Sequence, residues 1–177
     1  METSVIRSPR TAVELFRMLP EGVLCEVIEN TIYMSPGASF THQIIKGKIK
    51  SKIESQVEKN KLGYVLDAPF DVFLDENNVF QPDILYINKN NPGKIHPNGG
   101  FEGAPDIVVE ILSLTNQKHD LEKKKIVYER CGVKEYWIAD PFEKEVTGYY
   151  LEKKSFKPFP KAKGKIKSKL LGKTFSF

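Results

Sequence analysis

The sequence predicts an α/β or α+β domain with a mixed sheet. Segments with apolar side chains at helical spacing alternate with short runs rich in β-branched and aromatic residues, in the order helix, two strands, helix, four strands, helix, three strands. A chain of 177 residues suits one domain, which buries roughly 70% of its unfolded surface. We therefore expect a single domain over residues 1–177, with an N-terminal extension at 1–9 and Lys-rich strands at 152–177.

The first part of the chain is expected to form a helix, a hairpin and a longer helix. Thr11-Ala-Val-Glu14 is a capping box, and Ser39 can cap the later helix. The turn pair Glu29-Asn30 between two apolar runs favours a hairpin. The expected elements are a helix from Thr11 to about Leu19, strands at Leu24–Ile28 and Thr31–Met34, and an amphipathic helix from Thr41 to about Lys59.

After Gly63 the apolar pattern is that of strands, so a meander with short turns is the simplest layout. The stretch 88–105 is rich in Asn, Gly and Pro and is expected to be a long loop with a functional or a mobile role. The expected elements are strands at Tyr64–Leu66, Phe70–Leu74, Val79–Ile87 and Ile107–Leu112, a helix from about Lys118 to Cys131, and strands at Glu135–Ala139, Thr147–Leu151 and Lys165–Leu170.

Charge is distributed unevenly along the chain. Residues 152–177 carry nine lysines against the single acid Glu152, a net charge of +8, while residues 1–151 carry 18 basic and 22 acidic residues, a net charge of −4. The alternation in the last strand places Lys165, Lys167 and Lys169 on one face. This face is expected to contact a polyanion, and the alternative is a solvated edge strand whose lysines prevent aggregation.

Several classes of protein are excluded by composition. The two cysteines, Cys25 and Cys131, are far apart and form no CxxC pair, so neither a disulfide framework nor a zinc finger is expected. No apolar run approaches the ~18 residues of a membrane span, and the N-terminus lacks the apolar block of a signal peptide. We expect a cytoplasmic protein without a membrane partner.

Two carboxylates stand out as candidate metal ligands. Glu110 interrupts the apolar strand Ile107–Leu112, where a buried charge is costly unless it meets a metal or a cation. Asp83 follows Pro82, which marks a bend that can aim a carboxylate into a cleft. Together they form an oxygen-donor site suited to Mg²⁺ or Mn²⁺. The alternatives are a Glu110 that lies at the sheet edge or is satisfied by a structural Lys or Arg, and an Asp83 that belongs to an ordinary turn.

One face of the following helix carries a possible third component. Asp120, Lys124 and Tyr128 are four residues apart and therefore share a face. A lysine beside metal-binding carboxylates can position a water molecule and offset the charge that develops on a phosphate. The alternative is a surface ion pair between Asp120 and Lys124, which contributes well under about 1 kcal/mol.

These residues occur in a pattern that resembles the Uma-two family of the PD-(D/E)XK superfamily. The resemblance rests on Pro82-Asp83, on Pro105-Asp-Ile-Val-Val-Glu-Ile-Leu-Ser113, on Asp120-x3-Lys124-x3-Tyr128-x3-Gly132-Val133-x-Glu135-Tyr-Trp-Ile-Ala-Asp-Pro141, and upstream on Glu26–Pro36 and His42. It covers roughly residues 10–177 and implies a restriction-endonuclease-like mixed central sheet flanked by helices, with additional antiparallel strands. It also implies metal-dependent nuclease chemistry.

The resemblance also assigns roles to particular residues. It implies that Asp83 and Glu110 are catalytic metal ligands for Mg²⁺ or Mn²⁺, with the main-chain carbonyl of Ile111 and the carboxylate of Glu26 completing the ligand set. Leu112 stands where the lysine of (D/E)XK is expected, so Lys124 would take the lysine's catalytic role. The residues expected around the ligands are His42, Gln117, Asp120 and Tyr128.

Two readings of function follow. The first is a divalent-metal-dependent endonuclease that hydrolyses DNA, with Lys165, Lys167 and Lys169 contacting phosphates, as a homodimer or a higher homo-oligomer. The second, prompted by Leu112, is an inactive nucleic-acid-binding or assembly module on the same fold. A phosphoesterase for a small substrate is a third option, but no phosphate-binding glycine loop is visible.

Overall fold

The computed structural model describes residues 8–96, 99–113 and 118–177, and for residues 118–120 the backbone alone. Its central sheet is mixed, because β9 and β10 run parallel while the other neighbouring strands are antiparallel. Its strands, from edge to edge, are β12 (Ser155–Pro158), β11 (Glu145–Glu152), β10 (Glu135–Ala139), β9 (Ile107–Ile111), β6 (Ile84–Asn88) and β3 (Gly63–Asp67), with β13 (Ala162–Lys163) paired to β11.

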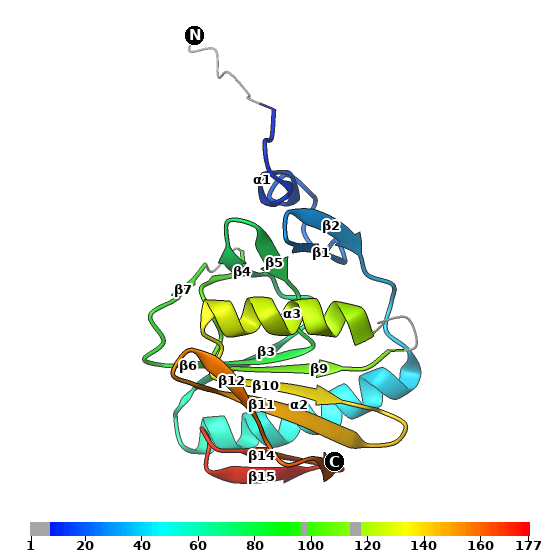
Figure 1. Cartoon of the computed structure of the whole chain (residues 1–177), viewed down its shortest axis with the longest axis vertical. Coiled ribbons are helices and arrows are strands. Elements are labelled where there is room, and N and C mark those ends of the chain that lie inside the picture. The colour runs from blue at the N-terminus through cyan, green and yellow to red at the C-terminus, as the bar shows by residue number, and fades with distance from the viewer. Residues whose placement is uncertain (1–7, 97–98, 114–117) are drawn as a thin grey trace.

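A second sheet lies above the central one in Figure 1. Its strands, in order, are β2 (Thr31–Met34), β1 (Cys25–Ile28), β5 (Asn78–Phe80), β4 (Val72–Asp75), β8 (Phe101–Glu102) and β7 (Lys94–Ile95). The hairpin β1–β2 turns at Glu29 and Asn30, whose φ values of 47° and 59° are those of a two-residue type I′ turn. The hairpin expected from the sequence is therefore confirmed.

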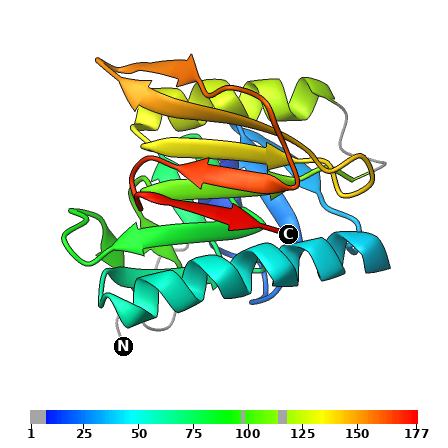
Figure 2. The same ribbon diagram turned by 90° about the horizontal axis from the view of Figure 1, so that it is seen from below.

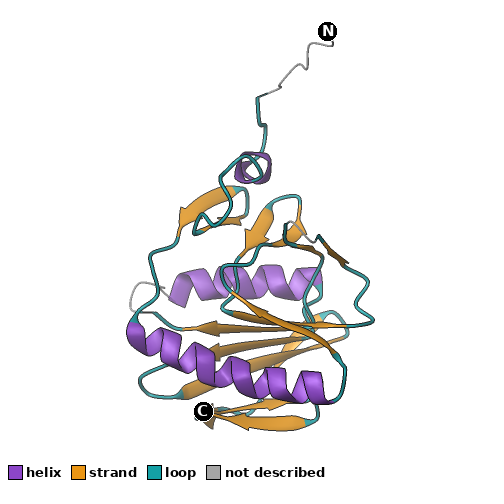
Figure 3. Cartoon of the chain, turned by 180° about the vertical axis from the view of Figure 1, so that it is seen from behind, coloured by secondary structure: helices purple, strands orange, loops and turns teal. Residues whose placement is uncertain are grey.

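The central sheet is covered on both faces. On one face lie α2 (Phe40–Lys59) and a two-stranded ribbon of β14 (Lys165–Ser168) and β15 (Lys173–Ser176), as Figures 2 and 3 show. On the other face lies α3 (Lys118–Cys131), close to the second sheet. The short helix α1 (Ala12–Phe16) packs on the outer hairpin. The expected mixed sheet flanked by helices, with additional antiparallel strands, is confirmed.

The alternation of side chains on β9 explains how the two layers pack. Ile107, Val109 and Ile111 enter the apolar cluster under α2, while Val108 joins the cluster under α3. Glu110 has the same strand parity as Val108 and therefore points towards α3. Covering both faces buries β9 along its whole length, which makes any polar side chain on it depend on partners from the neighbouring layer.

Five expectations about the elements are wrong. The strand expected at Val79–Ile87 is two strands in different sheets, broken at Pro82, which has no N–H to continue a ladder. The expected meander is also wrong, because β3 pairs with β6 and not with β4, the next strand along the chain. The stretch 88–105 contains the short strands β7 and β8. The first helix and the last Lys-rich strand end early, at Phe16 and Ser168.

The described residues contain no helix that is both long enough and apolar enough to span a membrane.

Candidate active site

A pocket of about 450 Å³ is lined by five of the residues that the sequence singles out. Its walls come from β1, from the start of α2, from the end of β9, from α3 and from the segments before β4 and β6. The expected site residues that line it are Glu26, His42, Asp83, Glu110 and Lys124. The fold therefore brings together side chains that are as much as 98 residues apart in the sequence.

Glu110 is buried, with 3% of its surface exposed, and α3 supplies its partners. Lys124 Nζ lies 3.2 Å from Glu110 Oε1, and the hydroxyl of Tyr128 donates a hydrogen bond of 2.9 Å to the same oxygen. The helical spacing of four residues places both donors on the side of α3 that faces the sheet. The expected shared face of Lys124 and Tyr128 is present in the structure.

Lys124 also binds Glu26 from the second sheet. Its Nζ atom lies 2.8 Å from Oε1 and 2.7 Å from Oε2 of Glu26, and the backbone N–H of Gln81 donates 2.8 Å to Oε1. Both oxygens of Glu26 are therefore engaged by the ammonium group of Lys124. In this arrangement Glu26 holds the lysine beside Glu110, although the resemblance suggested a metal ligand at this position.

Asp83 lies next to Glu110 across the β6–β9 ladder, because Ile84 pairs with Val109 in antiparallel register. Its Oδ2 atom accepts a hydrogen bond of 2.8 Å from the backbone N–H of Ile111 and lies 3.1 Å from Nε2 of His42. Pro82 ends the β5 segment just before it, so the carboxylate leaves the ladder and enters the pocket.

His42 stands in the first turn of α2, which Ser39 caps by accepting the N–H of His42 at 3.3 Å. The hydrogen bond to Asp83 raises the pKa of His42 above its usual value, against the opposing effect of burial. Its other ring nitrogen, Nδ1, is buried and has no hydrogen-bond partner among the described residues. His42 therefore supports Asp83 from the α2 side of the pocket.

The charges in the pocket shift one another. Burial raises the pKa of Glu110 to about 7, with Asp83 and Glu26 adding to the rise and Lys124 opposing it. Burial alone would lower the pKa of Lys124, but the charges of Glu110 and Glu26 outweigh it and raise the pKa above its usual value. The raised pKa of Lys124 favours its charged form, and any further positive charge placed beside Glu110 would favour the ionised form of that carboxyl group.

Lys46 is a pocket residue that sequence reasoning missed. It is buried. Its Nζ atom donates a hydrogen bond of 3.2 Å to the carbonyl of Ala68 and lies 3.4 Å from Oδ2 of Asp67. The available signal was its spacing, since Lys46 lies one helical turn after His42 and so shares its face. Gln81, which links Glu26 to the rest of the pocket wall, has no local sequence signal at all.

Other expected site residues lie elsewhere. Lys165 and Lys167 are exposed on β14, whose ribbon packs against α2 and β11, and Lys169 lies in the turn after it. None of the three lines the pocket. Gln117 and the side chain of Asp120 lie outside the described residues.

The donor set suits a small divalent cation. Asp83 and Glu110 supply hard oxygen ligands in one pocket, and Mg²⁺ characteristically binds one or two carboxylates and keeps water and substrate phosphate oxygens for its remaining positions. Within the described ranges no cluster of three or more Asp, Glu, His or Cys side chains is arranged around a metal position. The two carboxylates are oxygen donors of the kind that Mg²⁺ and Mn²⁺ prefer, and substrate and water would have to supply the remaining ligands of such a site.

Comparisons with known proteins identify the family of the chain and a solved structure of similar fold. Among solved structures, a crystal structure described as a "putative nuclease belonging to DUF820", from Anabaena variabilis, is similar with a TM-score of 0.69 and 26% identity, covering 85% of this chain and 84% of that chain. No curated protein matches the chain. A family model described as "Uma2: Putative restriction endonuclease" matches residues 12–165. The chain belongs to the Uma2 family.

Proposed function

We propose that the protein is an endonuclease that uses a divalent metal ion to hydrolyse phosphodiester bonds in DNA. The observation that carries this proposal is the convergence of Asp83, Glu110 and the buried cation of Lys124 in one pocket. The membership in a family described as restriction endonucleases supports it. Each of these three side chains has a role in the proposed reaction, and each role follows from the contacts that the side chain makes in the pocket.

Asp83 and Glu110 would hold the metal ion, Mg²⁺ or Mn²⁺, and the main-chain carbonyl of Ile111 would be a further oxygen ligand. When bound, the ion supplies a water molecule of lowered pKa and a Lewis acid for the phosphate. The amide of Ile111 and the imidazole of His42 fix Asp83 through hydrogen bonds of 2.8 and 3.1 Å, so that its carboxylate is oriented before the metal arrives.

Lys124 acts as a fixed positive charge. Its raised pKa means that the ammonium group keeps its proton, so it donates hydrogen bonds to the attacking water or to the phosphate oxygens and does not act as a base. Glu26 holds it in place, and Tyr128 fixes the carboxylate of Glu110. Lys46 adds a second cation to the wall of the same pocket.

Contacts with DNA outside the pocket come from the lysines of the C-terminal ribbon, Lys165 and Lys167, and from Lys169. Their charges contribute sequence-independent attraction to phosphates, so affinity should fall steeply as salt rises. Because these residues lie away from the pocket, they can contact a long substrate that extends beyond it, but they cannot contact a mononucleotide bound inside it. Cleavage of both strands would be served by a symmetric dimer, which we include in the proposal.

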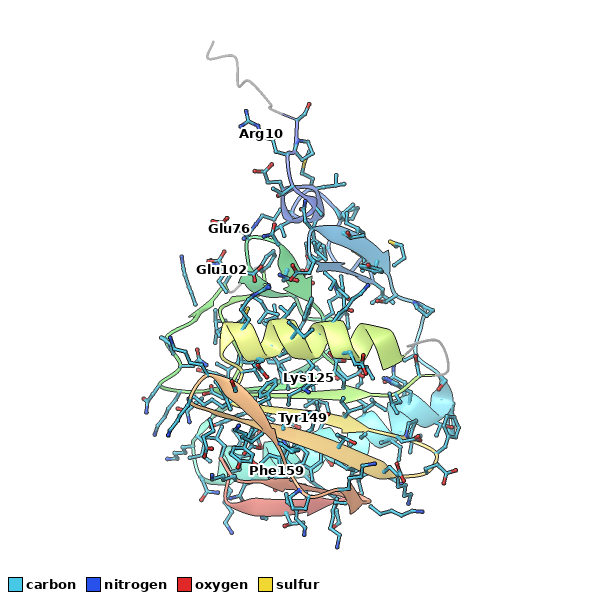
Figure 4. All side chains as sticks on the ribbon, in the orientation of Figure 1. Arg10, Glu76, Glu102, Lys125, Tyr149 and Phe159 are labelled. Carbon is cyan, nitrogen blue, oxygen red and sulfur yellow. The ribbon has the colours of Figure 1, made fainter. Side chains whose placement is uncertain are left out.

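The test is nicking of supercoiled plasmid in the presence of Mg²⁺ or Mn²⁺. We expect cleavage by the wild type, no cleavage with a chelator, and a loss of about 10²–10³-fold in Lys124→Ala, the size that removal of one preorganised donor produces. Lys125→Ala is the matched control, because Lys125 is next on α3 but stacks over Tyr149 at 4.1 Å outside the pocket (Figure 4).

A second candidate function is an inactive DNA-binding module, which Leu112 at the expected lysine position favours. Equal traces of cleavage in the wild type, Lys124→Ala and Lys125→Ala would indicate a contaminating nuclease. Salt-sensitive binding of DNA without metal-dependent turnover would then replace the first proposal.

A further inference from the structure

A second pocket, of about 580 Å³, adjoins the first. It is formed by the end of α1, the segment leading into β1, the segment before and within β4, and the loop before β8. Gly22, Pro69 and Gln81 line both pockets. The two hollows therefore share a wall.

Aromatic side chains line one part of this second pocket. Phe16, Phe70 and Phe73 face it, and the rings of Phe16 and Phe73 meet edge to face at 6.0 Å. The guanidinium of Arg17 stacks over Phe73 at 4.1 Å and is held by Glu102 at 3.1 Å. Flat aromatic and guanidinium surfaces of this kind are those on which nucleic-acid bases stack.

A hydrogen-bond acceptor lies in the same wall. Asp71 Oδ1 accepts a hydrogen bond of 2.8 Å from Nε2 of Gln81, and the same nitrogen donates a hydrogen bond of 3.1 Å to the carbonyl of Val23. The other oxygen of Asp71, Oδ2, makes no hydrogen bond to any residue that the structure describes. The backbone N–H of Gln81 reaches Glu26, the residue that holds Lys124. One residue thus connects the aromatic pocket to the cation of the candidate active site.

We propose that the second pocket binds the base of the nucleotide whose phosphate lies beside Glu110. This inference rests on the proposed nuclease function and specifies its substrate. The base stacks on Phe70 and the neighbouring aromatic surface, and Asp71 accepts a hydrogen bond from an exocyclic amino group, which cytosine carries and thymine lacks. A base inside a duplex cannot enter a pocket, so the substrate carries an unpaired or extruded nucleotide at the cleavage position.

The test compares ligands that differ only in the base. We would titrate the wild type with dCMP, dTMP and deoxyribose 5-phosphate by calorimetry in the presence of Mg²⁺. We expect dCMP to bind at least about tenfold more tightly than deoxyribose 5-phosphate, as stacking of one base provides. Phe70→Ala should remove this advantage and leave the affinity for deoxyribose 5-phosphate unchanged.

A second variant covers the case in which Phe70→Ala fails to fold. Asp71→Asn keeps the shape of the side chain and should abolish the preference for dCMP over dTMP while base stacking persists. Phe142→Ala, which removes an exposed aromatic ring outside both pockets, is the control and should bind all three ligands as the wild type does.

The outcomes separate the two proposals. Equal affinity of the wild type for dCMP and deoxyribose 5-phosphate, no binding of either, or an unchanged base advantage in folded Phe70→Ala would overturn the base pocket, whatever the plasmid assay gives. A base-dependent gain that Phe70→Ala removes, in a protein that never nicks plasmid, would retain the base pocket and overturn the nuclease.

Discussion

Lys124 Nζ lies 3.2 Å from Oε1 of Glu110, although the two residues belong to different elements, α3 and β9. Leu112 follows Glu110 by two residues at the end of the strand, and its backbone N–H donates a hydrogen bond to the carbonyl of Ala139. The cation that the strand itself does not provide therefore comes from the helix that covers it. Glu26 completes the contact from a third element, β1.

Removing this cation should destabilise the fold. Lys124→Met leaves Glu26 and Glu110 buried without their partner, which costs ~3–5 kcal/mol of unfolding free energy when one member of a buried ion pair is lost. Urea denaturation measures the loss. Lys125→Met, on the neighbouring side of α3, should change stability little, and a similar loss in both variants would contradict the buried pairing.

Two buried tyrosines offer a matched comparison. Tyr128 donates to Glu110, while the hydroxyl of Tyr136, whose ring centroid lies 5.0 Å from that of Tyr128, has no partner among the described residues. Tyr128→Phe should cost ~1–3 kcal/mol, the penalty of an unmade buried hydrogen bond. Tyr136→Phe should be neutral or stabilising. Denaturant midpoints that fall equally in the two variants would show that Tyr128 does not hold Glu110.

Much of the local structure could be predicted from the sequence, because its signals are local. The hairpin at Glu29-Asn30, the cap at Ser39 and the burial of Glu110 each follow from short-range patterns, and the structure contains all three. The assignment of strands to sheets could not be predicted in this way. The break at Pro82 and the pairing of β3 with β6 depend on contacts between distant segments.

Two glycines should respond to alanine with opposite signs. A Cβ on Gly148 would overlap the ring of Trp137 in the packed core, so Gly148→Ala should cost at least ~1–3 kcal/mol through overpacking. Gly47 lies on the exposed side of α2 with open space around it, so Gly47→Ala should gain ~0.5–1 kcal/mol of helix stability. Thermal unfolding of the two variants distinguishes these signs.

The stability contributed by Asp75 should depend on pH. Burial alone would raise its pKa, but hydrogen bonds from Asn78 and Asn77, together with the charge of Arg130, hold the pKa below its usual value of 3.8. A lowered pKa in the folded state adds stability at pH values above 3.8 and loses it as pH falls through the folded value. Urea curves at about pH 7 and about pH 2 should therefore show a smaller gap between wild type and Asp75→Asn at the acidic pH. A gap that widens on acidification would contradict the assignment.

The two acidic residues of the candidate site could be predicted from the sequence, but the contacts that surround them were harder to predict. Asp83 and Glu110 stand out because a carboxylate is unusual at a bend before an apolar run or within one. The contact of Lys124 with Glu26 spans 98 residues, and no periodicity in the chain indicates it. Lys46 and Gln81 line the pocket only because of how α2 and the segment before β6 pack.

The most direct test of the central claim measures cleavage and DNA binding on one preparation of Glu110→Gln. This substitution keeps the shape of the side chain and removes a proposed metal ligand. We predict that Mg²⁺-dependent nicking of plasmid disappears while affinity for DNA is unchanged or improved, since a negative charge leaves the pocket. Nicking by Glu110→Gln at the wild-type rate would contradict the assignment of Glu110 as a catalytic metal ligand.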